Sequence, residues 1–202
     1  RRQRQMCIRD SITGASSLPG YRTAMAFLKR GYKVVGTHLT HEIPIEDPNF
    51  FKARVDITDL DSLRRVFENH RPLAVIHIAA YGDVDGCERD KSLAWRINVV
   101  GTLNVMRLAA KYCKYALYLS TDYVFDGKKG EYVEDDPPCP INYYGLTKLV
   151  GEEIVRMSGV LYCIVRTSAI WGSPPGKANF ATFVVDRLRA GETVKALSLI
   201  HI

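Results

Sequence analysis

The stretch SITGASSLPG, residues 11–20, decides the fold. An apolar run ends at a glycine, a short turn follows, and a helical pattern, YRTAMAFLKRG (21–31), begins at once. Gly14 and Gly20 lie six residues apart, close to the glycine spacing in which a pyrophosphate rests on a helix N-terminus, where free N–H groups and the helix dipole favour anions. The stretch predicts a strand–turn–helix unit that binds a dinucleotide; a plain turn is the alternative.

Outward from this unit, strand-like and helix-like segments alternate along the chain. Apolar strand patterns recur at YKVVGT (32–37), FKARVD (51–56), LAVIHIAA (73–80), YALYLST (115–121) and LYCIVRTS (161–168). Helical spacing of apolar residues marks 60–70, a long helix from Leu93 to Ala110, and 181–191. This alternation predicts right-handed βαβ units and an α/β fold, a Rossmann-type doubly wound parallel sheet. Ligands of such sheets bind beyond the carboxyl ends of the strands.

The two ends of the chain share one DNA segment. Codons for LSLIHI (197–202), read on the opposite strand, encode MCIRD (6–10) and the following serine. This inverted pair resembles the adapter of a transposase-prepared sequencing library. We therefore expect residues 1–10 and 197–202 to be adapter-derived, residues 11–172 to form an NAD(P)-binding domain with the catalytic residues, and residues 173–196 to begin a C-terminal substrate-binding lobe that is largely missing.

Composition excludes several classes of function. The net charge is +6, but residues 1–10 hold four arginines and one aspartate and so contribute +3 of it, which argues against nucleic-acid binding. No apolar run approaches the roughly 18 residues of a membrane span, and no signal peptide is visible. The remaining cysteines are widely spaced, at Cys87, Cys113, Cys139 and Cys163. We expect a cytoplasmic protein with reduced thiols, no disulfide, no bound metal and no membrane contact.

The first two strand ends bear on the cofactor. Ser17 replaces the middle glycine of the turn: its Cβ can hold the main chain away from a phosphate, or its hydroxyl can donate a hydrogen bond to one. Thr37 and His38 follow the second strand, where an NAD-binding protein usually carries an acidic residue for the ribose 2′-OH. Neither repels a 2′-phosphate, so the pattern favours NADPH over NADH. A solvated His38 is the alternative.

The next strand ends add further cofactor candidates. Asp56 can accept a hydrogen bond from an adenine amino group or help to cap the next helix. Ala79 and Ala80 are small enough for a flat ring to lie against the main chain, or for a helix to pack closely. The expected cofactor contacts along these turns are Gly14, Ser16, Ser17, Leu18, Gly20, Thr37, His38, Asp56, Ile57, Ala79 and Ala80.

The segment NYYGLTK (142–148) places a phenol and an amine four residues apart. On a helix these positions share one face, with Cβ atoms about 5–6 Å apart. A cation beside a phenol stabilises the phenolate and lowers the phenol pKa from about 10. Thr121 ends the fifth strand at the same sheet edge. We expect Thr121, Tyr144 and Lys148 to form a proton-transfer site, although Tyr-x-x-x-Lys alone also suits a surface contact.

Residues 120–153, STDYVFDGKKGEYVEDDPPCPINYYGLTKLVGEE, carry a family resemblance. From about residue 11 to 196 the chain resembles the extended short-chain dehydrogenase/reductases, and within them the dTDP-4-dehydrorhamnose reductase family. VDGCE (84–88), INVVGT (97–102) and VRTSAIWG (165–172) support the resemblance. The family continues well beyond residue 196, and that continuation forms much of its sugar-nucleotide pocket.

The resemblance implies an NADPH- or NADH-dependent reductase that delivers hydride to C4 of a nucleotide-linked 4-keto-6-deoxy sugar. Tyr144 would donate the proton, Lys148 would stabilise the tyrosinate and hold the nicotinamide ribose, and Thr121 would hydrogen-bond the carbonyl oxygen. Asn98, with Tyr144 and Lys148, would lie beside the cofactor and shape the proton path. The expected substrate contacts are Asp85, Thr121, Asp122, Asn179 and Phe180. A homodimer is left open.

Several alternatives remain at this point. Asp85 can simply start a helix, and Arg166 can face a phosphate or form an internal ion pair. The chain also resembles the beta subunit of methionine adenosyltransferase, an NADP-binding regulatory protein, so a non-catalytic role is a second interpretation. An NDP-sugar epimerase is a third. A dehydratase is disfavoured because Asp122 is followed by Tyr123 and not by glutamate.

Overall fold

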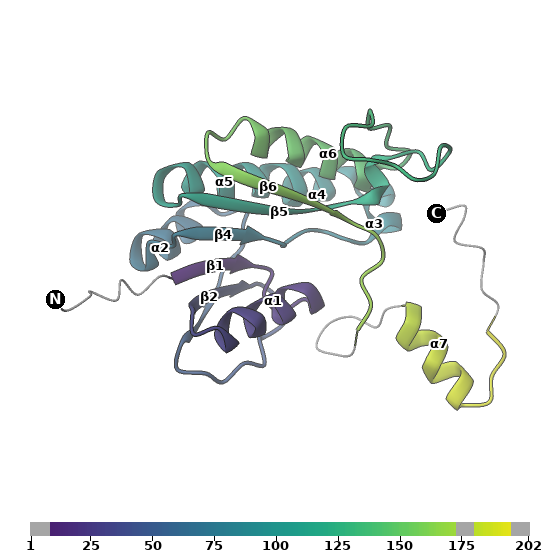
Figure 1. Cartoon of the computed structure of the whole chain (residues 1–202), viewed down its shortest axis with the longest axis horizontal. Helices are drawn as coiled ribbons and strands as arrows, with labels where there is room; N and C mark the ends of the chain where they lie inside the picture. Colours follow the sequence, from purple (N-terminus) through teal and green to yellow (C-terminus); the bar gives the residue numbers. More distant parts are fainter. Residues whose placement is uncertain (1–8, 173–179, 195–202) are drawn as a thin grey trace.

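The computed structural model describes residues 9–172 and 180–194. Its centre is a six-stranded, all-parallel sheet with the strand order β3-β2-β1-β4-β5-β6 (Figure 1). The strands are β1 (Arg9–Thr13), β2 (Lys33–His38), β3 (Phe50–Arg54), β4 (Ala74–His77), β5 (Tyr115–Thr121) and β6 (Leu161–Thr167). The predicted Rossmann-type fold is confirmed.

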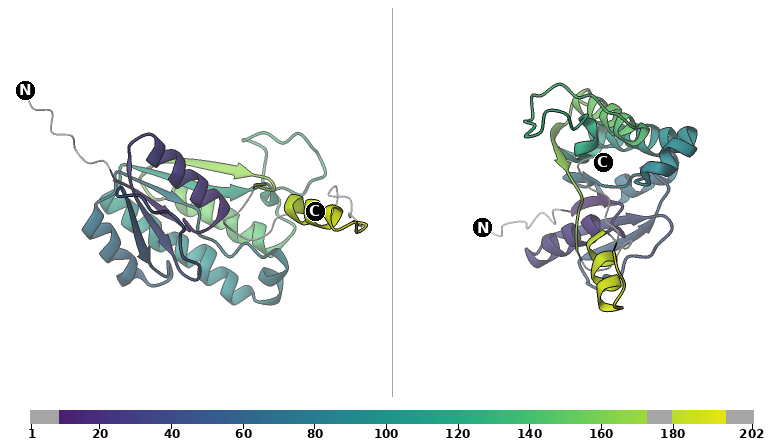
Figure 2. Two further views of the ribbon diagram at one scale, coloured as in Figure 1. Left: turned by 90° about the horizontal axis from the view of Figure 1, so that it is seen from below. Right: turned by 90° about the vertical axis from the view of Figure 1, so that its right-hand side faces the viewer.

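Helices connect the strands and cover both faces of the sheet. They are α1 (Leu18–Lys29), α2 (Leu60–His70), α3 (Val84–Arg89), α4 (Lys91–Trp95), the π-helical turn η1 (Arg96–Val100), α5 (Gly101–Tyr112), the short 3₁₀ helix η2 (Asp122–Val124), α6 (Tyr143–Arg156) and α7 (Phe180–Arg189). In the right-hand view of Figure 2, α1 lies on one side of the sheet and α4, α5 and α6 lie on the other.

Two apolar cores hold these layers together. Successive strand residues point to opposite faces, which is why continuous apolar runs form strands that are covered on both sides. Val35 and Val75 pack against α2, α5 and α6, whereas their neighbours Val34 and Ile76 pack against α1. At the β6 edge, Leu161 stays exposed. The sheet is therefore best buried at its centre, where β1 and β4 meet.

The helix expected from Leu93 to Ala110 is the main difference from the sequence-based prediction. The chain there forms α4, the π-helical turn η1 and α5 in succession. A π-helical turn accommodates one extra residue and often marks a functional site. The apolar spacing continues through the turn, so the pattern alone did not reveal it.

The first strand extends further toward the N-terminus than the predicted domain boundary. β1 begins at Arg9 and pairs with β2 from that residue on, so it includes the last two residues of the segment expected to be adapter-derived. Asp10 is buried, and burial raises the pKa of its carboxyl. An aspartate is costly at such a position, since the charged form loses its hydration.

Two kinds of feature are missing from residues 9–172 and 180–194. No helix in these ranges combines the length and apolar character that a membrane crossing requires. Nor do these residues bring together three or more side chains that could ligate a metal ion.

Candidate active site

The candidate site lies where the two halves of the sheet part. β1 and β4 are neighbours at the centre, and the chain proceeds from β1 to β2 on one side and from β4 to β5 on the other. Such a switch point opens a crevice beyond the carboxyl ends of the strands. Most of the residues expected from the sequence lie in segments that follow these ends.

The two glycines of the first turn are required by its shape. Gly14 has a φ of +68°, and a Cβ there would lie 2.8 Å from the main-chain nitrogen of Ala79. A Cβ on Gly20 would lie 2.3 Å from the Gly14 carbonyl oxygen. The turn therefore packs directly against the segment after β4 at Gly14, and a side chain at Gly20 would instead push the start of α1 away from the turn.

Ser17 serves the turn itself. It caps α1, accepting a hydrogen bond from the Gly20 N–H at 3.2 Å, and its hydroxyl donates to the Gly14 carbonyl at 2.7 Å. Its single proton is thus used within the turn, so in this arrangement the hydroxyl does not donate outward to a phosphate. Ser16 and Leu18 flank it, half-buried, at the helix end where N–H groups and the dipole favour an anion.

The end of β2 is joined to the same turn. The Thr37 carbonyl accepts a hydrogen bond from the Ala15 N–H at 2.9 Å, and Thr37 is buried. His38 is half-buried, and its Nδ1 atom is enclosed without a hydrogen-bond partner among the described residues. The role of His38 beside a ribose stays a prediction, since the enclosed Nδ1 atom does not itself face solvent.

Other predicted cofactor contacts have structural roles. The Asp56 carboxylate accepts from the Thr58 N–H at 2.8 Å in the turn before α2, whereas Asp59 caps the helix itself. The Ile57 side chain is buried in the apolar core and therefore does not face the crevice. Ala79 is half-buried against Gly14 and Ala80 is exposed, so both leave the end of β4 open.

Thr121, Tyr144 and Lys148 gather around the end of β5. Thr121 is its last residue, and its hydroxyl accepts from the Tyr123 N–H at 3.2 Å. The Tyr144 ring packs edge-on against Tyr123, with ring centroids 6.0 Å apart. One helical turn later, the Lys148 Nζ lies 4.1 Å from the centre of the Tyr118 ring on β5. Tyr144 and Lys148 therefore share the face of α6 that packs on β5.

The environment of Tyr144 differs from the sequence-based expectation. Burial raises its pKa to about 12, and Cys87, Asp122 and Tyr123 add to the effect. The expectation of a lowered Tyr144 pKa is wrong for the protein alone, because desolvation and these three neighbours all raise it. Tyr144 is thus held in its protonated form at neutral pH, as a proton donor requires.

Lys148 is one of the largest fully buried side chains. Burial lowers its pKa to about 7, while Glu152 acts in the opposite direction. Among the described residues Lys148 forms no ion pair. Its ammonium group lies over the face of the Tyr118 ring, an arrangement that stabilises a desolvated cation. Lys148 is therefore poised to gain or lose a proton near neutral pH.

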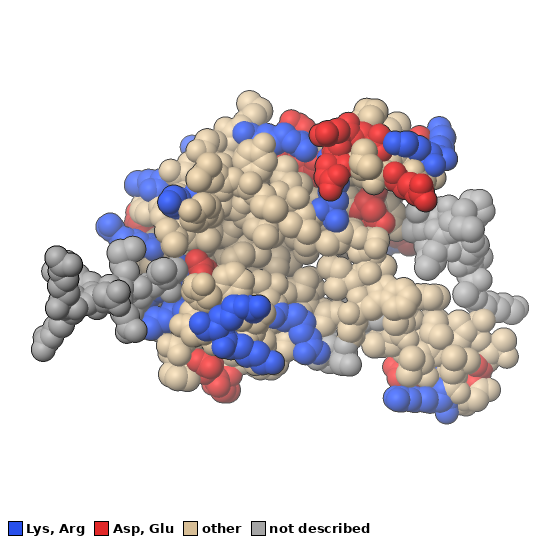
Figure 3. Space-filling model, in the orientation of Figure 1, with Lys and Arg blue, Asp and Glu red and all other residues tan. Residues whose placement is uncertain are grey.

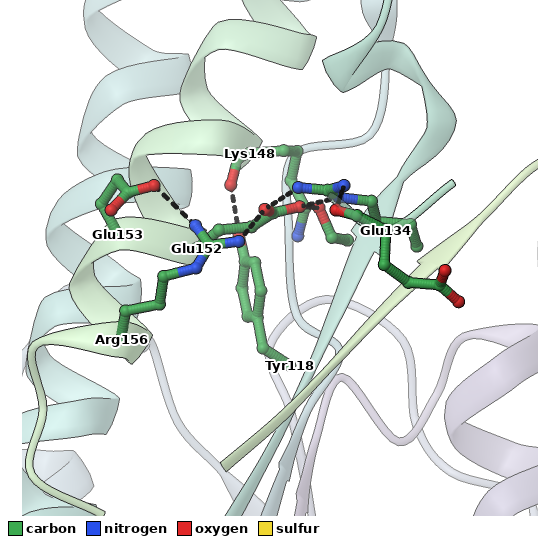
Figure 4. Close-up of polar contacts among 8 residues, drawn as sticks. Tyr118, Glu134, Lys148, Glu152, Glu153 and Arg156 are labelled. Carbon is green, nitrogen blue, oxygen red and sulfur yellow. Dashed lines mark hydrogen bonds and ion pairs between the residues drawn. The ribbon is translucent and has the colours of Figure 1, made fainter. Parts of the chain in front are cut away.

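Glu152, one turn beyond Lys148, is occupied by other partners (Figure 4). Its Oε1 accepts from the Ser120 hydroxyl at 2.6 Å and the Arg166 Nε at 2.9 Å. Its Oε2 accepts from the Arg166 Nη2 at 2.7 Å and the Arg156 Nη2 at 3.0 Å. Arg166 thus forms the internal ion pair that the sequence left open, and Glu152 is not available to neutralise Lys148.

Asn98 fixes the π-helical turn to its surroundings. Its side-chain oxygen accepts from the Tyr81 N–H at 2.7 Å, and its Nδ2 donates to the Tyr81 carbonyl at 3.1 Å and to the Thr147 hydroxyl at 3.0 Å. Thr147 lies one residue before Lys148. Asn98 therefore joins the segment after β4 to α6 directly beside the lysine.

The predicted substrate contacts are only partly brought together. Asp85, in the first turn of α3, and Asp122, after β5, are both exposed. Phe180 begins α7, a helix without buried residues that stands apart from the sheet (Figure 1). Asn179 lies outside the described residues. The structure therefore brings the residues predicted to bind the cofactor and to catalyse the reaction closer together than the predicted substrate contacts.

Three buried residues were missed in the sequence. His77, Tyr118 and Glu152 are all nearly inaccessible to solvent and lie below or beside the predicted catalytic group. His77 is polar within an apolar strand run, and Glu152 lies four residues after Lys148 on the same helix face, so both carried a signal. Tyr118 carried none, because a tyrosine in a strand is ordinary.

Comparison with known proteins identifies relatives of this chain. The family model described as "RmlD substrate binding domain" matches residues 11–198. The probable low-salt glycan biosynthesis reductase Agl14 of Haloferax volcanii is 34% identical over 187 residues, 91% of this chain and 61% of that protein. The methionine adenosyltransferase 2 subunit beta of Xenopus laevis is 32% identical over 164 residues, 81% of this chain and 47% of that protein.

Solved structures give the same answer for the fold. A hypothetical dTDP-4-dehydrorhamnose reductase from Sulfolobus tokodaii superposes with a TM-score of 0.80 at 35% identity, over 93% of this chain and 64% of its own. The dTDP-4-dehydrorhamnose reductase of Bacillus anthracis, solved with NADP, gives 0.78 at 32% identity, over 92% and 61%. The chain thus spans somewhat less than two thirds of the length of these proteins.

Proposed function

Because this chain belongs to the RmlD substrate binding domain family, within the extended short-chain dehydrogenase/reductases, we propose that it is part of an NADPH-dependent reductase of a nucleotide-linked 4-keto-6-deoxy sugar. The observation that supports the proposal is that Tyr144 and Lys148 lie one turn apart on α6 and pack against Tyr123 and Tyr118, while Thr121 ends β5. The relatives described as reductases support the reaction class.

The cofactor side of the crevice fits a dinucleotide. The turn at Gly14 and Gly20 brings main chain, without side chains, to the N-terminus of α1, and this end favours a pyrophosphate. The end of β2 carries Thr37 and His38 and no carboxylate, which suits the 2′-phosphate of NADPH. When bound, the reduced nicotinamide supplies the hydride.

The chain's own residues supply the proton and hold the substrate oxygen. Tyr144, protonated at neutral pH, donates its proton to the oxygen of the C4 carbonyl as negative charge develops there. The Lys148 ammonium stabilises the resulting tyrosinate, and each pKa unit by which it does so corresponds to about 1.4 kcal/mol. The Thr121 hydroxyl donates to the same substrate oxygen, exchanging its present bond to Asp122.

Replacement of the proton donor tests this function. Tyr144→Phe removes only the phenol oxygen, so we expect the rate of NADPH oxidation with dTDP-4-dehydrorhamnose to fall at least about 100-fold while NADPH still binds. The assay follows nicotinamide absorbance and uses the protein in the longest form its gene encodes.

The adjacent tyrosine is the matched control. Tyr143 donates its main-chain N–H to Glu88 and its ring lies under Lys91, away from the proposed reaction. Tyr143→Phe should therefore leave the rate unchanged. Normal turnover by Tyr144→Phe, or an equal loss in both variants, would overturn the role of Tyr144.

A second function is favoured by one observation, the match to methionine adenosyltransferase 2 subunit beta. In that case the chain would bind NADP(H) and a partner protein without turning over a sugar. NADPH binding measured by calorimetry, with no oxidation of NADPH by any 4-keto-6-deoxy sugar nucleotide, would support this second function over the first.

A further inference from the structure

A series of buried polar side chains below the candidate site is not used by the proposed reaction. Its members come from β1, β4, α5, η1 and α6, and all of them are at most 1% exposed. Such groups are costly to bury unless each finds a hydrogen-bond partner. The members are Thr13, His77, Thr102, Asn98 and Thr147.

The direction of the hydrogen bonds is set at the Asn98 carbonyl. The Thr102 hydroxyl lies 2.6 Å from this oxygen, which can only accept, so Thr102 must donate its one proton there. Thr102 can then only accept from the His77 Nε2, 3.0 Å away. The hydrogen of the imidazole is therefore on Nε2.

The other ring nitrogen is then an acceptor. The Thr13 hydroxyl lies 2.6 Å from the His77 Nδ1 and donates to it. The lone pairs of the same hydroxyl accept from the N–H groups of Ile78 and Ala79, at 3.1 and 3.2 Å. Burial, with a smaller effect of Lys148, lowers the His77 pKa to about 3, which agrees with a neutral ring.

Beyond Asn98 the bonds continue in the same direction. The Asn98 side-chain oxygen accepts from the Tyr81 N–H, which fixes the amide so that Nδ2 faces Thr147 and donates to it. The Thr147 hydroxyl in turn donates to the Tyr144 carbonyl at 2.8 Å. Each hydrogen bond of the series is thus donated in the same direction, from Thr13 on β1 toward Tyr144 in the first turn of α6.

We propose that His77 is a positioning residue: as a neutral, Nε2-protonated imidazole it links the cofactor-binding turn after β1 to the π-helical turn and the catalytic face of α6. The series of hydrogen bonds begins at Thr13, directly before Gly14, and ends at the carbonyl of Tyr144. The part of this inference that concerns catalysis rests on the proposed function; the tautomer and the link to the turn do not.

Two replacements separate the two halves of the link. The side-chain amide of asparagine reaches the position of a histidine Nδ1, and that of glutamine reaches the position of Nε2. His77→Asn keeps an acceptor for Thr13 but loses the donor to Thr102, whereas His77→Gln keeps the donor and loses the acceptor. His77→Asn should therefore weaken the link toward Thr102 and α6, whereas His77→Gln should weaken the link to Thr13 and the turn after β1.

The expected kinetic results follow from this separation. One neutral hydrogen bond corresponds to roughly a 5- to 10-fold effect. We expect His77→Asn to lower kcat by about this factor with little change in the Kd for NADPH, and His77→Gln to weaken NADPH binding by about this factor with a smaller loss in kcat. Leu63→Ala is the control, because it removes buried volume in α2 and no member of the hydrogen-bond series. It should lower Tm without a selective effect on either kcat or the Kd for NADPH.

The tautomer is tested independently of activity. The ring nitrogens of ¹⁵N-labelled histidine distinguish protonated from unprotonated sites, and the His77 resonances are assigned by their loss in the two variants. We expect a protonated Nε2 and an unprotonated Nδ1 from about pH 5 to 8, well above the lowered pKa.

Each result bears on one level of the inference. A charged ring or an Nδ1-protonated ring would overturn it, as would equal effects of His77→Asn and His77→Gln matching those of Leu63→Ala. If the wild-type protein shows no reductase activity, the proposed function fails, while the tautomer and the NADPH affinities of the two variants still decide whether His77 positions the turn.

Discussion

At the scale of single residues, Lys148 is where function and stability conflict. A fully buried ammonium loses its hydration, and burial accordingly lowers the Lys148 pKa to about 7. The nearby carboxylate of Glu152 is already bound by two arginines and a serine, so it compensates the lysine only in part. The candidate active site thus retains a cation that the fold would be more stable without.

Lys148→Met should therefore stabilise the protein while it abolishes reduction. Because the folded-state pKa lies below the unfolded value of 10.5, the lysine destabilises the fold most below about pH 7, and this penalty disappears as the pH rises toward the unfolded pKa. We expect a gain of about 1–3 kcal/mol in the free energy of unfolding near pH 6 and almost none near pH 10, measured by urea denaturation.

The exposed Lys29 on α1 provides the matched control. Lys29→Met removes a lysine without changing the buried charge, so the difference between its unfolding free energy and that of the wild type should be small and equal near pH 6 and near pH 10. A loss of stability in Lys148→Met near pH 6 would contradict the account of Lys148 as a costly buried cation.

At the scale of secondary-structure elements, Glu152 joins α6 to the neighbouring strands β5 and β6. Arg166 of β6 contacts both oxygens of Glu152, and Ser120 of β5 contacts one of them (Figure 4). Burial raises the Glu152 pKa, but the hydrogen bonds from Arg166, Ser120 and Arg156 outweigh it and hold this pKa below its ordinary value. The helix that carries Tyr144 and Lys148 is thus fixed to the sheet by one carboxylate.

Arg166→Met should cost about 3 kcal/mol in the free energy of unfolding at pH 7, because it leaves Glu152 buried with fewer partners. Arg156→Met, which removes a more exposed partner, should cost about 1 kcal/mol. The Glu152 contribution is present above the ordinary carboxyl pKa and is lost as the pH falls through its lowered folded value, so the two variants should converge in acid. If chemical denaturation at pH 7 gave equal losses of unfolding free energy for Arg166→Met and Arg156→Met, Arg166 would not be the main partner of Glu152.

Element by element, the sequence predicted the strands well because apolar runs and turn glycines are local signals. The helix 60–70 and the strand 115–121 coincide with α2 and β5. The π-helical turn at Asn98 could not be predicted, since it depends on partners at Tyr81 and Thr147 that are distant in the chain. The pKa of Tyr144 was predicted in the wrong direction for the same reason: burial is a property of the whole fold.

At the scale of the whole molecule, basic and acidic side chains are interspersed, and the ion pairs Lys129–Asp136 and Lys128–Asp126 join both signs within one loop. Figure 3 shows basic side chains over α1, which carries Arg22 and Lys29, and acidic side chains near the loop after β5, which contains Glu134, Asp135 and Asp136. The net charge of +6 is therefore not gathered into a single basic face in this view.

The burial of Tyr118 under Lys148 has a consequence for alkaline titration. Burial raises the Tyr118 pKa far above its ordinary value of about 10, so this phenol stays protonated in moderately alkaline solution. Of the eleven tyrosines, the enclosed ones should ionise only as the fold opens. We expect tyrosinate absorbance to rise in two stages, the second coinciding with loss of helical circular dichroism, and Tyr118→Phe to shrink the second stage alone. A single smooth rise would show that Tyr118 is open to hydroxide; two stages would make this phenol an intrinsic optical reporter of global unfolding in base.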